Sequence, residues 1–121
     1  MTDIVVDNAV TAADLRASNT PNYRLINVNK TVSEMLTFAY TRIAAKNSAG
    51  DDEVTFNFTR SMYDKWLKDI KPETRVKVHE RFVNFLDEKG FNIDESIDID
   101  GNDVIEDYVT VSWNDDSDYE F

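Results

Sequence analysis

Cysteine is absent from this chain of 121 residues, and histidine occurs only once, as His79. Disulfide frameworks, structural zinc sites, iron–sulfur clusters and thiol catalysis depend on these side chains, so the sequence excludes them. The three glycines, Gly50, Gly90 and Gly101, are too few and too scattered for a phosphate-binding loop or a dinucleotide fingerprint. No cofactor is therefore expected.

Long apolar runs are absent as well. No stretch approaches the roughly 20 consecutive apolar residues that a membrane span requires. The start, Met1-Thr2-Asp3, lacks the basic segment followed by an apolar one that marks a secretory signal. We therefore expect no membrane insertion and no secretion, and the expected location is the cytoplasm.

Positive charge is missing from the last part of the chain. The net charge is −11, and residues 1–93 hold all 13 Lys and Arg together with 13 acids, so they are balanced. The other 11 acids lie in residues 94–121, which contain no base: Asp94, Glu95, Asp98, Asp100, Asp103, Glu106, Asp107, Asp115, Asp116, Asp118 and Glu120. Such asymmetry bears on solubility and partners rather than on the fold. The acidic segment could keep the protein soluble, lie against the chain's own basic helices, or face a basic partner.

Apolar spacing predicts a helix followed by a strand. Thr31 and Glu34 form a capping-box pattern, after which apolar residues recur on one helical face until Asn47 to Gly50. Strict alternation then places Val54, Phe56 and Phe58 on one side of a half-buried strand.

Two more helices and a pair of strands are expected after that strand. Ser61 can open a second helix, and Pro72 a third that runs to about Lys89 and ends at Gly90 in a Schellman motif. Phe91 to Trp113 read as extended chain around an Asp100-Gly101 turn. The sequence thus predicts a single α+β domain with about three helices packed on one face of a small, mostly antiparallel sheet.

The chain divides into three parts in this interpretation. Residues 1–30 form an N-terminal arm, with a short helix at Thr11 to Ala17, a turn at Asn19 to Asn22 and extended chain from Tyr23 to Val28. Residues 31–113 form the core, and residues 114–121 form an acidic tail that contains two aromatic residues.

The segment from Leu36 to Trp113, about two-thirds of the chain, resembles small αβ accessory proteins of tailed bacteriophages. The resemblance lies in a helix ending Ala44-Ala45-Lys46-Asn47 before Gly50, an alternating strand, a helix closing as Phe85-Leu86 with Gly90-Phe91, and a final Val109-Thr110-Val111-Ser112-Trp113. It implies a viral origin, a location in the host cytoplasm or the virion, and an accessory, assembly or host-directed role. The matching residues are core and cap residues, so no catalytic residue is carried over.

Two groups of residues could carry chemistry, and each has a simpler explanation. His79 could serve a catalytic triad, but no partner set is marked, and a boundary histidine bonded to a neighbour is the preferred interpretation. Ser96, Asp98, Asp100, Gly101 and Asp107 partly match a calcium loop, although its twelfth position is aspartate and its flanks read as strands. A hairpin turn coated with acids accounts for the same residues. No metal site is therefore assigned.

The two middle helices and their connections contain several basic residues: Arg60, Lys65, Lys68, Lys71, Arg75, Lys77 and Arg81. Two helices across a short turn are typical of some nucleic-acid readers. Acids are interleaved with these bases, however, and the acidic end would repel phosphates, so a solvated helical surface is the preferred interpretation. Nucleic acid, a membrane and a small-molecule substrate are not expected as partners.

The leading hypothesis is a non-enzymatic protein–protein interaction protein, a phage virion or assembly component or an accessory factor. Its partner would be a basic protein surface, another virion protein or a second copy of itself. Aromatic residues anchor interfaces and charges steer them, so the predicted partner-binding residues are Asp115, Asp116, Asp118, Tyr119, Glu120 and Phe121, with Asp103, Glu106 and Asp107. The alternative is an acidic inhibitor that mimics nucleic acid and binds a host DNA- or RNA-binding protein. An enzyme that uses carboxylates and a metal is a third option, with no spacing that selects its ligands.

Overall fold

Residues 23–114 are described by the computed structural model. Along the chain these residues form α2 (Val28–Ser48), β1 (Glu53–Asn57), the 3-10 turn η1 (Ser61–Tyr63), α3 (Asp64–Leu67), α4 (Pro72–Glu88), β2 (Asn92–Asp100) and β3 (Asp103–Ser112). The helix predicted at residues 11–17, the turn at residues 19–22 and the tail beyond Asn114 lie outside the described residues.

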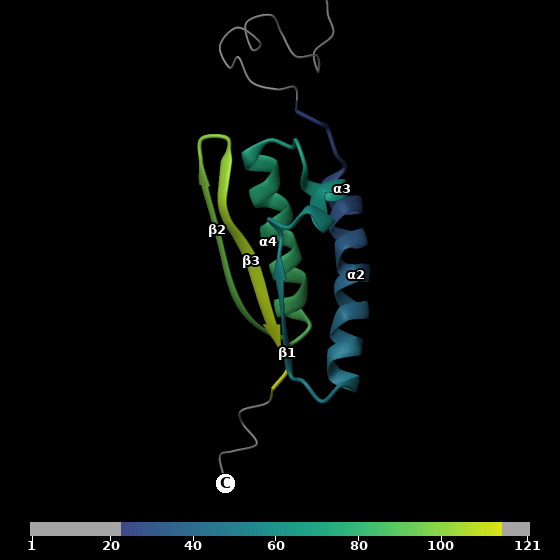
Figure 1. Cartoon of the computed structure of the whole chain (residues 1–121). Helices are drawn as coiled ribbons and strands as arrows, with labels where there is room; N and C mark the ends of the chain where they lie inside the picture. Colours follow the sequence, from purple (N-terminus) through teal and green to yellow (C-terminus); the bar gives the residue numbers. More distant parts are fainter. Residues whose placement is uncertain (1–22, 115–121) are drawn as a thin grey trace, which may run out of the picture.

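The three strands form one antiparallel sheet in the order β1-β3-β2. The helices lie on the same face of this sheet, and no other element within residues 23–114 covers the opposite face, which we call the open face (Figure 1). Along β1, Val54 and Phe56 are buried toward the helices, whereas Glu53 and Thr55 are exposed. The α+β architecture predicted from the sequence, with helices on one face of an antiparallel sheet, is confirmed.

The long hairpin of β2 and β3 carries one irregularity near its tip. Asp98 pairs with Glu106 and Ile99 with Val104, which leaves Ile105 as an extra, exposed residue on β3. The two-residue loop begins at Gly101, whose φ of 62° is the positive value that the first position of a type II′ turn requires. The predicted Asp100-Gly101 turn is therefore confirmed.

The first helix begins earlier than its sequence pattern predicted. Asn27 is the N-cap, and its side-chain oxygen accepts a hydrogen bond of 3.0 Å from the backbone nitrogen of Lys30. Thr31 is buried inside the helix, and Glu34 accepts from the indole nitrogen of Trp66 at 3.0 Å. The capping-box interpretation of Thr31 and Glu34 is therefore wrong, because a better cap lies one turn upstream. Tyr23 to Asn27 belong to no helix or strand, and Asn27 has extended φ and ψ.

The second helix is much shorter than predicted. The 3-10 turn η1 leads into the single turn of α3, and the chain then leaves the helix at Lys68, whose φ and ψ are extended. Asp69 follows with a positive φ of 62°. Trp66, Leu67 and Ile70 are buried as expected, but Met62 is exposed. One side of the segment is therefore buried as predicted, but the continuous second helix is replaced by a 3-10 turn and a single α-helical turn.

Both long helices end as the sequence pattern indicates. At the end of α4 the backbone nitrogen of Gly90 binds the carbonyl of Asp87 at 3.0 Å, and that of Phe91 binds the carbonyl of Leu86 at 3.2 Å. With a φ of 94° at Gly90, these bonds form the predicted Schellman motif. Gly50 ends α2 in the same way, with a φ of 92°.

The core lies between the inner face of the sheet and the helices. Phe82 of α4 is fully buried and packs edge-on against Phe56 and Phe58, with ring centroids 5.9 and 5.1 Å apart. Replacing such a phenylalanine with alanine typically costs about 3–5 kcal/mol. This aromatic cluster therefore fixes α4 against the sheet, and so positions the charged residues that α4 carries.

Candidate functional site

Four charged side chains connect α4 to the inner face of the sheet, and we call them the histidine network: Arg75, His79, Glu95 and Asp107. Arg75 and His79 lie one turn apart on α4, so they point the same way. Asp107 of β3 has the same strand parity as buried Val109, and Glu95 of β2 pairs with Val109. Helix and strand periodicity thus bring the four side chains together.

Asp107 is the centre of the histidine network. Its Oδ2 accepts a hydrogen bond of 2.8 Å from Nε of Arg75, and its Oδ1 lies 2.7 Å from Nδ1 of His79. The other ring nitrogen of His79, Nε2, lies 2.6 Å from Oε1 of Glu95. Asp107 is 1% exposed and His79 is 2% exposed, so both lie in the interior. Buried charges are tolerated only when they are paired in this manner.

Arg75 also holds the end of β1 in place. Its Nη2 donates a hydrogen bond of 2.8 Å to the carbonyl of Phe58, whose own backbone nitrogen donates to the carbonyl of Asp107 at 2.8 Å. Arg75 therefore ties α4, the chain after β1, and β3 together through one guanidinium group. Arginine suits this role because its planar fork can serve two acceptors at once.

The electrostatics of the network favour a protonated histidine. Burial acts to lower the pKa of His79, but the hydrogen bonds and charges of Asp107 and Glu95 outweigh it, so the pKa is raised above its ordinary value. The imidazolium can donate to both carboxylates at the same time. Two cations then face two anions.

This arrangement does not present His79 as a general base. A general base needs a free ring nitrogen within hydrogen-bond reach of the substrate proton. Both nitrogens of His79 contact carboxylates, and the ring is buried. The prediction of a histidine bonded to a neighbour is confirmed, but its placement at the boundary of the core is wrong. The geometry indicates a structural role, in which His79 links α4 to β2 and β3.

The alternation of β3 in the sequence indicates that Asp107 is buried, which the distribution of charge alone does not. Asp107 stands two residues before Val109 and four before Val111, so alternation places its carboxylate on the buried face. An acid at an inward position requires a buried cation. Arg75 and His79, four residues apart beside the apolar stripe of α4, were the candidates.

The open face of the sheet carries a second constellation. All three strands lack lysine and arginine, and six of their acids are exposed on that face, at its edges or at the hairpin tip: Glu53, Asp94, Asp98, Asp100, Asp103 and Glu106. We call these six residues the acidic sheet surface. Among residues 23–114, none of the six forms an ion pair with a base.

Several of these carboxylates lie opposite one another. Asp98 pairs with Glu106 across the two strands, and Asp100 pairs with Asp103 beside the loop. Like charges directly opposite in a sheet are destabilising. Glu106 is partly accommodated by a hydrogen bond from the hydroxyl of Ser96. The negative potential also raises the pKa of the Tyr108 hydroxyl, chiefly through Asp94, with smaller effects of burial, Glu106 and Glu95. The surface is thus strongly negative.

The predicted partner-binding residues differ in exposure, and some of them lie outside the described residues. Asp103 and Glu106 belong to the acidic sheet surface. Asp107 is buried and bound to Arg75 and His79, so it cannot contact a partner and that assignment is wrong. Asp115, Asp116, Asp118, Tyr119, Glu120 and Phe121 lie outside the described residues.

The structure separates the residues of the partial calcium loop. Ser96 and Asp98 lie on β2 and Asp107 lies on β3, where its carboxylate is taken by Arg75 and His79. Within residues 23–114, no group of three or more potential ligands is arranged to hold a metal ion. The hairpin interpretation of these residues is the one the structure supports.

The basic middle segment does not form a two-helix reader. α3 is only one turn long, and Arg75 is bound to Asp107 within the histidine network. Arg81 donates a hydrogen bond to the side-chain oxygen of Asn29 on α2. The remaining basic side chains are exposed and interleaved with acids, which is typical of a solvated surface.

Comparisons with known proteins give no relatives. The chain matches no protein-family model, no curated protein and no solved structure. Among the helices within residues 23–114, none has the length and apolar character needed to cross a membrane.

Proposed function

We propose that this protein is a non-enzymatic protein-binding module that presents the acidic sheet surface to a basic surface of another protein. The observation that carries the proposal is the segregation of charge between the layers. The three strands contain acids and no base, whereas all the bases within residues 23–114 lie on the helices and loops. A one-sided field of this kind steers a partner of opposite sign to one face of the molecule.

Repulsion within the like-charge pairs of the acidic sheet surface should also favour the binding of a cationic side chain. Asp98 and Glu106 repel each other in the free protein, at a cost of roughly 0.2–1 kcal/mol for such a pair. A lysine or arginine placed between them would convert this repulsion into attraction. An accessory or assembly role in a tailed bacteriophage remains part of the proposal and rests on the sequence resemblance alone.

The test compares two variants with the same change in charge. Asp94→Asn, Asp98→Asn and Glu106→Gln together neutralise the sheet face, whereas Glu73→Gln, Glu80→Gln and Asp87→Asn neutralise three exposed acids of α4. Tagged wild type and both triple variants are expressed in the host, and the co-purified proteins are quantified. The α4 variant should retain the partner and the sheet variant should lose it, in a salt-dependent manner. Equal capture by all three chains, or no specific capture, would contradict the proposal.

A nucleic-acid mimic is the second candidate, and one observation favours it. Such an inhibitor needs carboxylates spread over one face without intervening bases, and the acidic sheet surface has this property. Duplex DNA or RNA added to the captured complex distinguishes the two candidates. Displacement of the partner by nucleic acid would support the mimic, whereas a complex that is insensitive to nucleic acid would support a protein–protein interface.

A further inference from the structure

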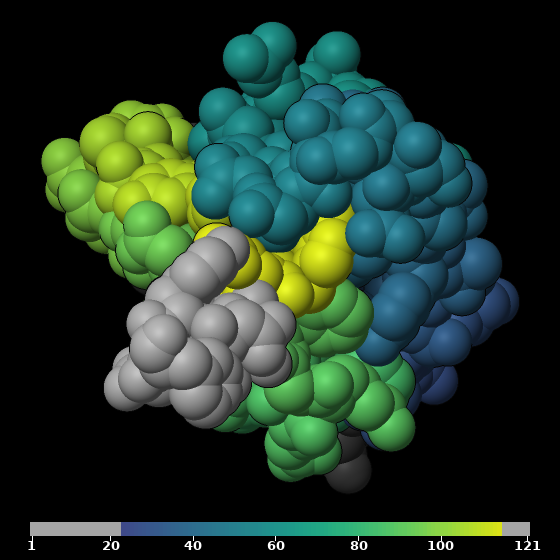
Figure 2. Space-filling view, turned by 90° about the horizontal axis from the view of Figure 1, so that it is seen from below, coloured from purple at the N-terminus to yellow at the C-terminus, as the bar shows by residue number. Residues whose placement is uncertain are grey.

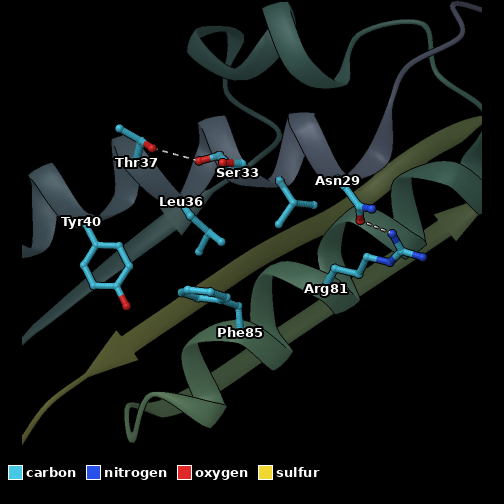
Figure 3. A pocket seen from close by; sticks show the side chains of 8 residues that line it. Asn29, Ser33, Leu36, Thr37, Tyr40, Arg81 and Phe85 are labelled. Carbon is cyan, nitrogen blue, oxygen red and sulfur yellow. Dashed lines mark hydrogen bonds between the residues drawn. The ribbon is translucent and has the colours of Figure 1, made fainter.

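A groove runs between α2 and α4 on the side of the helix layer away from the sheet, and its volume is about 450 Å³ (Figure 3). Val32 and Leu36 contribute apolar side chains to its lining, and the rings of Tyr40 and Phe85 approach from the two helices at one end. At the other end, Arg81 donates its hydrogen bond to Asn29. Tyr40 is 37% exposed and Phe85 is 38% exposed, although both are large apolar residues. The groove is thus apolar in its middle and basic at one end.

A series of aromatic rings leads from this groove to the point where the C-terminal segment leaves the sheet. The ring centroids of Phe85 and Tyr40 are 6.5 Å apart, those of Tyr40 and Phe91 are 6.0 Å apart, and those of Phe91 and Trp113 are 6.5 Å apart. Trp113 is itself fixed, because its indole nitrogen donates to the side-chain oxygen of Asn47 at 3.1 Å. Partly buried aromatic residues therefore join the groove to the last described residues.

The end of β3 faces the same end of the molecule as the turn between α4 and β2. Viewed from below, the end of β3 emerges between the α2–β1 connection and the residues that follow α4 (Figure 2). Asn92, the first residue of β2, donates its side-chain amide to the carbonyl of Asn114 at 3.2 Å. The chain beyond Asn114 therefore starts close to Phe91, the middle of the aromatic series.

We propose that residues 115–121 of the same chain occupy the groove between α2 and α4. The length of the segment allows it, because seven residues span up to roughly 23–25 Å when extended. The three ring-to-ring steps place Phe85 no more than about 19 Å from Trp113. The segment can therefore reach Tyr40 and Phe85 without any movement of the core.

The chemistry of the segment matches the groove. Tyr119 and Phe121 can continue the aromatic series against Tyr40 and Phe85, since edge-to-face pairs add to the gain from burial. The negative charge of the segment, which contains four acids, is complementary to basic side chains near the groove. The Nζ of Lys89 lies 5.2 Å from the ring centroid of Phe85, and Arg81, which also donates to Asn29, lies at the far end of the groove. The groove carries no part of the acidic sheet surface, so this inference does not depend on the proposed partner.

A single spin label tests the placement in the full chain. Because the protein contains no cysteine, Ser117→Cys gives one unique attachment site for a nitroxide. In isotope-labelled protein, the amide signals of Leu36, Tyr40 and Phe85 should lose intensity, while those of Asp98 and Glu106 on the open sheet face should not. Adding Tyr119→Ser and Phe121→Ser to the labelled chain should restore the groove signals, because these substitutions remove the aromatic anchors.

Mixed samples identify other occupants. Isotope-labelled protein without the nitroxide is mixed with spin-labelled protein without isotope, so that any loss of intensity arises between chains. No loss in this mixture supports docking within one chain, whereas loss at the groove would assign it to the tail of a second copy and overturn the proposal. Unchanged groove signals in the singly labelled chain, or a loss spread evenly over both faces, would also overturn it.

Discussion

Removal of the Asp107 carboxylate should be among the most damaging single substitutions outside the apolar core. In Asp107→Ala, Arg75 and His79 keep their buried positions but lose their shared acceptor. The side chain of Arg75 is only 11% exposed and that of His79 is 2% exposed, so solvent cannot replace the lost carboxylate. Breaking a buried ion pair from one side typically costs about 3–5 kcal/mol. Since small domains have stabilities of about 5–15 kcal/mol, this loss is a large part of the total.

Urea unfolding followed by tryptophan fluorescence measures this loss, because Trp66 is buried in the core. Asp103→Ala is the matched control, since Asp103 is an exposed acid of the same strand. Because it removes the repulsion with Asp100, it should leave the free energy of unfolding unchanged or raise it by up to about 1 kcal/mol. Should Asp107→Ala fail to fold, Asp107→Asn retains the shape and one acceptor. We expect it to lose about 1.5–3 kcal/mol, the usual value of a charged hydrogen bond. A loss below about 1 kcal/mol in both Asp107 variants would refute the structural role of the network.

Three further predictions concern pH, a helix end and the acidic sheet surface. His79 has a raised pKa in the folded protein, so its protonated form stabilises the fold below its ordinary pKa of about 6.5, and this contribution is lost as the pH rises through the folded value. The difference in unfolding free energy between wild type and His79→Gln should therefore be larger at about pH 5.5 than at about pH 8.5, and a constant difference would contradict the network. Gly90→Ala forces a side chain into a φ of 94° and should lower the free energy of unfolding by about 1–2 kcal/mol, which denaturant titration can measure. Asp98→Asn removes the repulsion with Glu106 and should raise the free energy of unfolding by about 0.2–1 kcal/mol, whereas a loss of stability would mean that the two acids do not repel.

The fold was predictable where one local signal acted without a competitor. Alternation alone placed Val54 and Phe56 inward, and Pro72 with Gly90 marked both ends of α4. The start of α2 was predicted wrongly because two capping patterns lay one turn apart. Asn27 became the cap, and Glu34 was recruited by Trp66 from a segment 32 residues away. A long-range contact of this kind leaves no trace in the local pattern.

The difference between local signals and long-range contacts also explains how much of the candidate site could be predicted. The absence of bases from residues 94–121 was visible in the sequence, but not which acids would be exposed. Asp107 and Glu95 are held by residues of α4, and only pairing of β2 with β3 placed them there. The extra residue in β3 also shifts the pairing between Asp98 and Ile99, which no turn signal indicated. The distribution of charge in the sequence therefore indicates the acidic segment, whereas the strand register decides which of its acids are exposed and which are bound by α4.

Hydrogen–deuterium exchange of the protein, free and bound to the partner recovered by co-purification, tests the central claim most directly. If the acidic sheet surface binds the partner, protection should increase along β2 and β3 and leave the exposed side of α4 unchanged. Protection confined to α2 and α4, with the β2–β3 hairpin exchanging as in the free protein, would contradict the account.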